Sequence, residues 1–418
     1  MTATTNAHTV TTPDPARRRQ DLPLQWLLLG TLVAYLPLAV LGYGTDVDVA
    51  NVLRAGRSAL DGDYEISRGP GATPHEVATA ALDRVGGPFL VNLAAVGFAL
   101  LAVWCVHRLL SLDGARWPGW AALVLAANPW FWLASTSLGD FTWSLALGLA
   151  GALAARRDRR VLAGVLFGLG IGCRASTVFL ALAWLVAERT GAPSDRRPWR
   201  DVVRTGATTV VVGALCFVPP WLSTDRTLDF LENELEFAGW GTHLGRWAVK
   251  NLATLTIPVG IVLVAGWKHL REAVRRWRMS AVVRFAVLTI VAMEVLFFRL
   301  PFKPVHLLPV IAGTVLLVGT VRLDRRRWLL ALVAAQLVAA TVGTTLAAPD
   351  RGDDADTGRI SLRPADGVIV NDVRCRLADL DRGDYVEGDS DAELAEATAR
   401  AEANWVCQRD SWRDAPSD

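Results

Sequence analysis

The sequence predicts an all-α polytopic membrane protein. Of its 418 residues, 52% are hydrophobic, and the mean hydropathy is +0.30. Apolar runs of about 20 residues with few charges recur along most of the chain, the length needed to cross about 30 Å of hydrocarbon. A soluble chain of this size instead shows amphipathic patterning around separate cores. The net charge of +2 decides little, because the distribution of charge along the chain carries the information.

Eleven transmembrane helices are expected. They fall near residues 25–43, 87–109, 119–138, 142–155, 161–173, 176–187, 205–222, 250–267, 281–299, 306–321 and 328–347. The stretch 161–187 is ambiguous, because a single long helix there would bury Arg174 in mid-membrane. Two half-length spans that meet at Arg174 keep every basic loop on one side, which favours a helical hairpin. The glycines at positions 164, 168, 170 and 172 favour close helix packing over nucleotide binding, since they lie inside an apolar helix.

Four basic connections predict the orientation. They are the segments 156–160, 196–200, 268–278 and 322–327, which fall on alternate connections. Cytoplasmic loops carry an excess of Lys and Arg, so these four loops are expected in the cytoplasm, together with the N-terminus. The acidic loop 223–249 then lies outside. The first apolar stretch is too long for a secretory signal peptide, which predicts a retained span in a multi-pass protein of the plasma membrane.

Three regions follow from these assignments. Residues 1–24 are expected to be a disordered cytoplasmic N-terminus, residues 25–347 a transmembrane domain with its first outer loop at 44–86, and residues 348–418 an extracytoplasmic domain. Residues 350–418 hold 18 acidic and nine basic side chains, which indicates a small soluble cap.

The cap is expected to be an α/β domain. The segment DGVIVND (366–372) predicts a strand, and DAELAEATARAEANWV (391–406) predicts a helix. Cys375 and Cys407 are the only cysteines outside the predicted spans. Two cysteines in a short extracytoplasmic domain predict a disulfide.

The first outer loop is unusually rich in charge. Its segment GTDVDVANVLRAGRSALDGDYEISRGPG, residues 44–71, contains five acidic residues and three arginines. Asp46 and Asp48 come directly before a helical pattern, whose apolar residues share one face from Val49 to Leu60. This pattern predicts a helix in the plane of the membrane interface. Asp46 has a second interpretation as the cap of that helix, because Asp is favoured there.

Further polar residues fall on the same predicted side of the membrane. A second helical pattern, Pro74 to Leu82, begins with His75 and Glu76, and other candidates follow the later spans. These others are Asp140 in SLGDFTW, Arg174 at the tip of the hairpin, His243 in GWGTHLGRW, and Arg299, Lys303 and His306 in RLPFKPVHLLP. Each has a simpler interpretation, as a helix cap, an interfacial histidine or a snorkelling arginine. Their convergence on one face nevertheless indicates a site at the outer surface.

These segments resemble the GT-C superfamily, the polytopic glycosyltransferases that use polyprenyl-phosphate sugars, such as the protein-mannosyltransferase and aminoarabinose-transferase types. The similar features are the acidic first outer loop followed by HE, the GDFTWSLAL segment, the LAGVLFGLGIGCR hairpin and the late PFKPVHLLP. They span roughly residues 25–321. Two departures stand out: a valine separates the two acids of the first loop, and PGATP stands where the family has Pro-Gly-Tyr-Pro.

The resemblance implies an inverting transfer of sugar from a polyprenyl-phosphate donor to a hydroxyl of a glycan, lipid or protein acceptor at the cell surface. Asp48 matches the family's catalytic carboxylate best, with Asp46 as its rival, and such a base takes the proton of the acceptor hydroxyl. The leaving lipid phosphate needs cations. The candidates for that phosphate are Arg68, Arg174, Arg299 and Lys303.

The resemblance also bears on cofactors and partners. A divalent metal ion is a possible cofactor, and the candidates for a metal or acceptor site are Glu76, His75, Asp140, His243 and His306. No nucleotide is expected, because the donor arrives through the lipid bilayer, and no nucleic-acid partner is expected.

Two other functions compete with this one. A transporter or lipid flippase needs charges and broken helices near mid-membrane, and often internal repeats. The sequence shows no repeat, and its charges lie at the outer mouth of the predicted bundle. A catalytically inactive relative that acts as a scaffold protein is the other alternative.

Overall fold

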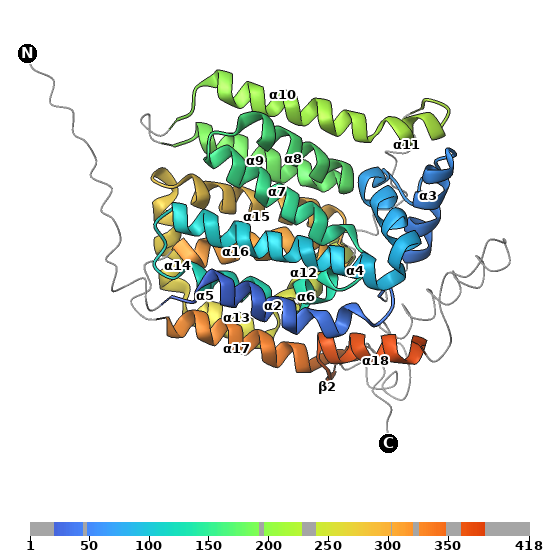
Figure 1. Cartoon of the computed structure of the whole chain (residues 1–418). Helices are drawn as coiled ribbons and strands as arrows, with labels where there is room; N and C mark the ends of the chain where they lie inside the picture. The colour runs from blue at the N-terminus through green and yellow to red at the C-terminus, as the bar shows by residue number, and fades with distance from the viewer. Residues whose placement is uncertain are drawn as a thin grey trace, which may run out of the picture.

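The structure, a computed structural model, describes residues 21–44, 48–191, 196–227, 240–301, 303–320, 326–347 and 361–380. It is a layered helical bundle (Figure 1). The long helices run alongside one another from α10 (Trp199–Cys216) at the top of the view to α17 (Arg327–Thr341) at the bottom. Helices α3 (Val49–Asp61) and α18 (Val368–Leu380) lie at one end of this bundle, on the right in Figure 1.

The other elements follow in chain order. They are α2 (Leu24–Ala39), α4 (Thr73–Leu112), α5 (Pro118–Ala126), α6 (Pro129–Ser135), α7 (Asp140–Arg156), α8 (Arg160–Cys173), η1 (Ala175–Thr177), α9 (Val178–Arg189), α11 (Val218–Ser223), α12 (Trp240–Leu255), α13 (Ile257–Ala265), α14 (Trp267–Arg275), η4 (Arg276–Arg278), α15 (Ala281–Arg299), η5 (Pro304–Leu307), α16 (Leu308–Thr320), β1 (Val342–Ala347) and β2 (Ser361–Asp366). Helix α7 is buried along nearly its whole length.

The described helices fit the predicted class of helical membrane protein. Three segments are long and apolar enough to cross a membrane, namely α4, Trp199–Ser223 and α15. Two bent helix pairs raise the number of candidates to five, and α2, α8, α17 and the η5–α16 segment are shorter apolar helices. The length and composition of the described helices therefore support a membrane-embedded bundle. The number of spans, predicted as eleven, is not confirmed.

Two predicted spans are broken in the structure. The expected helix 119–138 divides into α5 and α6, because Asn128 caps a new helix by accepting a hydrogen bond from the Phe131 backbone N–H (3.0 Å). Pro129 occupies the first position of that helix, where a missing N–H costs nothing. The expected helix 250–267 divides into α12 and α13, which meet at 85° beside Thr256, a residue with φ of +59°. The prediction of one continuous helix in each of these two stretches is therefore wrong.

The predicted hairpin around Arg174 is confirmed. Arg174 has an extended backbone between α8 and η1, and α9 returns alongside α8. At the other end of the hairpin, the Arg160 guanidinium donates to both oxygens of the Glu188 carboxylate at 2.7 and 2.9 Å. Both side chains are buried there, so the ion pair joins the two helices firmly.

The glycines of α8 allow close helix packing, as predicted. A Cβ atom at Gly164 would lie 2.8 Å from the Thr205 carbonyl oxygen, and one at Gly168 would lie 2.6 Å from Val212 Cβ. Both contacts are shorter than side chains tolerate, so α8 and α10 approach closely only because these positions are glycine.

Three of the four connections predicted to be cytoplasmic lie at one end of the bundle; most of the fourth, 322–327, is outside the described residues. Asp158 accepts from Arg160 at 2.8 Å and from Arg197 at 3.0 Å, which brings the segments 156–160 and 196–200 together. Arg284 donates to the carbonyl oxygens of Ala187 (2.7 Å) and Trp277 (2.9 Å), which adds the 268–278 segment to the same end. The basic connections that alternate along the sequence therefore meet in the folded chain, as a shared side of the membrane requires.

Cysteine labelling tests the predicted orientation. Glu65→Cys, in the first outer loop, should react in intact cells with a maleimide that does not cross membranes, because the Glu65 side chain is 57% exposed. Arg200→Cys, whose side chain position is 86% exposed, should react only after the cells are permeabilised. The reverse pattern would invert the topology.

Helix α3 forms where expected, but it does not lie with its apolar face in lipid. Val49, Val52 and Leu53 pack instead against Val91 of α4 and against Leu138. A Cβ atom at Gly56 would lie 2.1 Å from the Glu76 carbonyl oxygen, so α3 crosses α4 in direct contact. Protein rather than lipid therefore buries these apolar residues, and the position of α3 in the plane of the membrane interface stays a prediction. The second predicted helix is the first part of α4, which kinks at Gly86 and Gly87 before its apolar part.

The C-terminal region differs most from expectation. The last span ends at Thr341, and Val342–Ala347 forms β1, which pairs antiparallel with β2. The strand predicted at 366–372 is wrong, because α18 begins at Val368. A short apolar run does not distinguish a strand from a buried helix by its period. Residues 391–406 lie outside the described residues.

The disulfide is only partly covered by the structure. Cys375 is buried and disulfide-bonded. Cys407 lies outside the described residues, so its pairing with Cys375 stays a prediction. Cys105, Cys173 and Cys216 are free thiols within the helices, as expected for small apolar residues.

Candidate active site

Asp48 lies at the start of α3, beside two cations. Its Oδ2 atom receives a hydrogen bond from Arg68 Nη1 (2.5 Å) and lies 3.2 Å from Lys303 Nζ. Its side chain makes no capping bond to α3, although the residue occupies the N-cap position. Lys303 comes from the connection that follows α15, 255 residues along the chain. The Asp48 carboxylate therefore pairs with two cations from other parts of the chain instead of capping α3.

Arg68 links this carboxylate to a second one. Its Nη2 atom lies 2.8 Å from Oδ2 of Asp140, the first residue of α7. Asp140 also accepts from Arg174 Nη1 at 2.8 Å through its other oxygen, and its side chain is 3% exposed. A carboxylate at a helix N-terminus is favoured by the helix dipole. Asp140 thus holds two guanidinium groups in fixed positions.

Arg174 continues the chain of contacts to His306. Its guanidinium lies over the Phe141 ring, with 3.9 Å between Cζ and the ring centroid. Its Nη2 atom lies 3.2 Å from His306 Nε2, and the imidazole also contacts Phe141. A small pocket borders Arg174 and His306 and is also lined by Ser144 and Thr177. We refer to Asp48, Arg68, Asp140, Arg174, Lys303 and His306 as the charged cluster.

Glu76 anchors the loop that carries Arg68. Its carboxylate is buried and accepts hydrogen bonds from the Tyr64 hydroxyl (2.6 Å), the Ser67 hydroxyl and the Ala72 N–H (3.2 Å). Burial, together with the neighbouring Glu76 carboxylate, raises the pKa of Tyr64, so this phenol stays a hydrogen-bond donor. Three donors from one short loop on one carboxylate fix the conformation of residues 64–72.

His75 precedes Glu76 in the first turns of α4 and is buried against an aromatic ring. It is 1% exposed, and its ring meets Trp143 edge-on with 5.2 Å between centroids. Trp143 in turn stacks on Phe98 at 4.1 Å. The aromatic packing explains why this histidine is buried.

Sequence reasoning missed several supporting residues. Asp83 on α4 accepts from the Tyr43 hydroxyl (2.5 Å) and from Arg57 (2.8 Å), and these bonds fasten α3 and its preceding segment to α4. Tyr64 and Ser67, which hold Glu76, were also missed. The only sequence signal was a charged residue, Asp83, inside an otherwise helical pattern, and such residues are rarely buried without a partner.

Three of the predicted site residues are not part of the charged cluster. Asp46 is outside the described residues. His243 is a buried residue of α12, 3% exposed, and Arg299 is an exposed residue at the end of α15. Their part in the site stays a prediction.

The predicted metal ligands do not fit a metal in this arrangement. Among the described residues, no three His, Cys, Asp or Glu side chains gather in a way that would hold an ion. Both oxygens of Asp140 are directed at guanidinium groups, and both oxygens of Glu76 accept hydrogen bonds. No chemical step below is therefore assigned to a metal.

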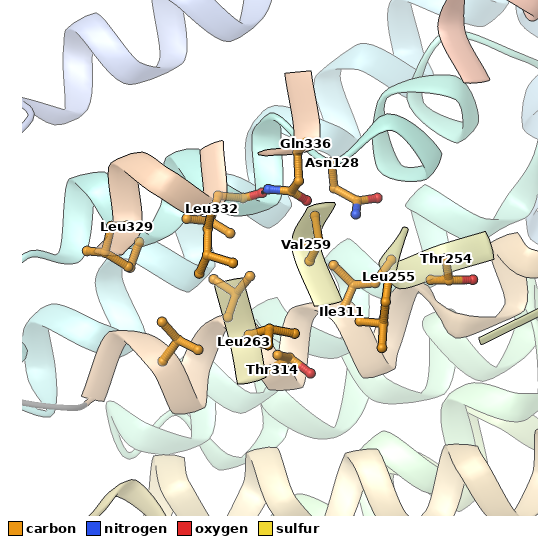
Figure 2. Close-up of a pocket in the computed structure, with 14 residues that line it drawn as sticks. Asn128, Thr254, Leu255, Val259, Leu263, Ile311, Thr314, Leu329, Leu332 and Gln336 are labelled. Atoms are coloured by element: carbon orange, nitrogen blue, oxygen red, sulfur yellow. Dashed lines mark hydrogen bonds between the residues drawn. The ribbon is translucent and has the colours of Figure 1, made fainter. Parts of the chain in front are cut away.

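A second pocket lies elsewhere in the bundle between α5, α13, α16 and α17 (Figure 2). Its lining is apolar except for Asn128, Thr254, Thr314 and Gln336. Gln336 donates to the Val124 carbonyl oxygen at 2.7 Å, so this amide serves helix packing. No ionisable side chain lines this pocket, which leaves the charged cluster as the candidate active site.

Comparison with known proteins shows which solved structures share this fold. No protein-family model matches the chain, and no curated protein matches it. Among solved structures, ArnT from Cupriavidus metallidurans bound to undecaprenyl phosphate superposes with a TM-score of 0.58 and 17% identity, covering 93% of this chain and 76% of that one. The apo structure of the same protein gives a TM-score of 0.54 and 16% identity, covering 92% and 75%. The chain therefore shares the fold of ArnT, in agreement with the fold that the resemblance implied.

Proposed function

We propose that this protein is a glycosyltransferase that moves a sugar from a polyprenyl-phosphate donor to an acceptor hydroxyl, with inversion at the anomeric carbon. The observation that carries the proposal is the Arg68 guanidinium, which joins Asp48 to Asp140 within a group of cations. The fold shared with ArnT, a protein solved with undecaprenyl phosphate, agrees with a lipid-phosphate ligand. In the proposed topology the chain crosses the plasma membrane eleven times, and the charged cluster faces outward.

Exposure distinguishes the roles of the two carboxylates. The Asp48 side chain is 28% exposed, whereas that of Asp140 is 3% exposed and paired with guanidinium groups through both oxygens. An acceptor hydroxyl can reach only the first. We therefore assign Asp48 as the general base that takes the hydroxyl proton while the oxygen attacks the anomeric carbon. Asp140 instead orients Arg68 and Arg174.

The cations of the charged cluster suit the leaving group. Arg68, Arg174 and Lys303 surround two carboxylates, which leaves one positive charge in excess. A polyprenyl-phosphate sugar is a phosphodiester with one negative charge. When the sugar–oxygen bond breaks, the electron pair stays on the phosphate, which becomes a monoester with a second developing charge. Fixed cations stabilise that charge most strongly in the transition state.

A transfer assay tests the proposal. The purified protein in reconstituted vesicles is given a panel of radiolabelled polyprenyl-phosphate sugars with glycan, lipid and protein acceptors. We expect transfer from at least one donor, with release of polyprenyl phosphate. If no donor supports transfer to any acceptor, the transporter and scaffold alternatives take its place.

Lys303→Ala should raise the KM for the donor about 10- to 100-fold, because a charge-assisted contact to phosphate contributes about 1.5–3 kcal/mol. The acceptor KM should change little. Lys268→Ala is the matched control, since Lys268 lies on α14, outside the charged cluster. An unchanged donor KM in Lys303→Ala would remove Lys303 from the phosphate site.

Chelation tests the role of a divalent ion. We expect transfer to persist in EDTA, because cationic side chains already surround the position proposed for the phosphate. Loss of transfer in EDTA, restored by Mg²⁺ or Mn²⁺, would show instead that an ion acts there.

A further inference from the structure

Helix α18 docks on the end of the bundle that carries the charged cluster. Its Ile369 packs with Leu38 of α2 and Ala340 of α17, and Val373 lies against the same group. Close docking is required by Gly367, because a Cβ atom there would lie 2.4 Å from the Ala340 carbonyl carbon. Figure 1 shows α18 beneath α2 at that end of the bundle. The chain from the C-terminal region therefore touches the transmembrane core.

Arg376 is the polar centre of this contact. Its side chain is 2% exposed, and its Nη1 atom donates to the carbonyl oxygens of Thr136 (2.7 Å) and Leu38 (3.2 Å). Its Nε atom lies 2.8 Å from Asp372 Oδ2, one turn earlier on α18. A buried guanidinium that bonds two carbonyls from distant segments fixes the distance between those segments.

Those two segments lead directly to the site carboxylates. The first runs from Leu38 to Gly44, just before Asp48, and the second runs from Thr136 to Asp140. They also touch each other, since the Leu138 N–H donates to the Tyr43 carbonyl oxygen (2.7 Å). A Cβ atom at Gly44 would lie 2.4 Å from Ser137 Cβ, so nothing larger than glycine fits between them.

We propose that Arg376 is a positioning residue that holds these two segments in register, so that Asp48 and Asp140 can both meet Arg68. Arg68 pairs with Asp48, which follows the first segment, and with Asp140, which ends the second, at 2.5 and 2.8 Å, so it tolerates little separation of the two carboxylates. The C-terminal region thereby acts on the site through α18. The catalytic consequence rests on the proposed function, whereas the structural consequence does not.

Hydrogen exchange measures the structural consequence directly. In Arg376→Met, amide exchange in a peptide covering residues 136–142 should rise about tenfold, because the Leu138 bond opens when the segments separate. Arg374→Met is the matched control on the same helix, since the Arg374 side chain is 53% exposed and contacts Asp366 and Asn371 rather than either of the two segments. Its exchange should equal that of the wild type.

Kinetics measure the catalytic consequence, normalised to folded protein. Misplacement of reacting groups by about 1 Å costs up to about 100-fold, so Arg376→Met should lower kcat and raise the donor KM by about tenfold each. Arg376→Lys keeps the charge but bonds fewer carbonyl oxygens. Its kcat and donor KM should fall between those of Arg376→Met and those of the wild type. This second variant keeps the test valid if Arg376→Met does not fold.

The outcomes separate two kinds of failure. Absence of transfer in the wild type removes the proposed function, and the exchange measurement still tests Arg376. Wild-type transfer with unchanged donor KM and unchanged exchange in Arg376→Met overturns the positioning role. Exchange that rises uniformly through the bundle, with donor KM unchanged, overturns it as well, because a general loss of stability explains that pattern.

Discussion

Asp48→Asn is expected to lower kcat for sugar transfer by about 100- to 10,000-fold, the range that a general base contributes. The substitution keeps the size of the side chain and its ability to accept a hydrogen bond from Arg68, but the amide cannot take a proton. Donor binding should change little, because Arg174 and the Asp140 carboxylate remain in place. Single-turnover transfer from a polyprenyl-phosphate sugar measures the rate of the chemical step.

Two further variants make this result specific. Asp61→Asn removes a carboxylate at the other end of α3, where Asp61 is 66% exposed and pairs with Arg84, and it should transfer at the wild-type rate. Asp46→Asn should be milder than Asp48→Asn, and the opposite order would identify Asp46 as the base. Full transfer by both Asp46→Asn and Asp48→Asn would leave the loop as a connection only, and the proposed function would lose its main support.

Several residues of the charged cluster could be predicted from the sequence because membrane topology leaves few possible arrangements. Once apolar spans alternate with basic connections, the polar residues on the remaining connections must share one end of the bundle. Asp140, Arg174 and His306 were selected in this way, and the structure brings them together. Which of the charged residues pair with one another could not be predicted. The contact of Asp48 with Lys303, for example, joins positions 255 residues apart and depends on how the helices pack.

The errors of prediction have local causes. The break between α5 and α6 had a sequence signal in Asn128 followed by Pro129, which is a helix cap and a first-turn proline. The bend between α12 and α13 has a sequence signal in Pro258, which lies in the first turn of α13. The positive φ of Thr256 has none, because a β-branched residue rarely adopts it. Strand β1 replaces the last turns of a predicted span where the chain reads VGTTLA, a segment rich in strand-forming threonine.

The face of α3 illustrates a different limit. An amphipathic pattern predicts one buried side but does not say what buries it. Helix α4 and Leu138 cover Val49, Val52 and Leu53, so the charge on α3 is free to serve other contacts. One of these is the bond from Arg57 to Asp83 at 2.8 Å, which holds the helix in place beside the site.

Arg68→Lys should lower kcat/KM for transfer by about 10- to 100-fold although the charge is conserved. Arg68 reaches Asp48 through one nitrogen and Asp140 through the other. A lysine ammonium is a point charge on a flexible stem and cannot reproduce this planar fork. Arg54→Lys is the matched control, because Arg54 lies on α3 with a 43% exposed side chain and a 3.8 Å contact to Glu65. It should retain wild-type kcat/KM.

A double variant then tests whether Arg68 and Asp48 work as one unit. If Arg68 acts partly by placing the base, then Asp48→Asn removes much of what Arg68 contributes, and the combined loss must be smaller than the product of the two single losses. Independent effects would multiply, and they would assign Arg68 to the phosphate alone. A wild-type rate in Arg68→Lys would exclude both roles, because the bridge between the two carboxylates is the feature from which the site is inferred.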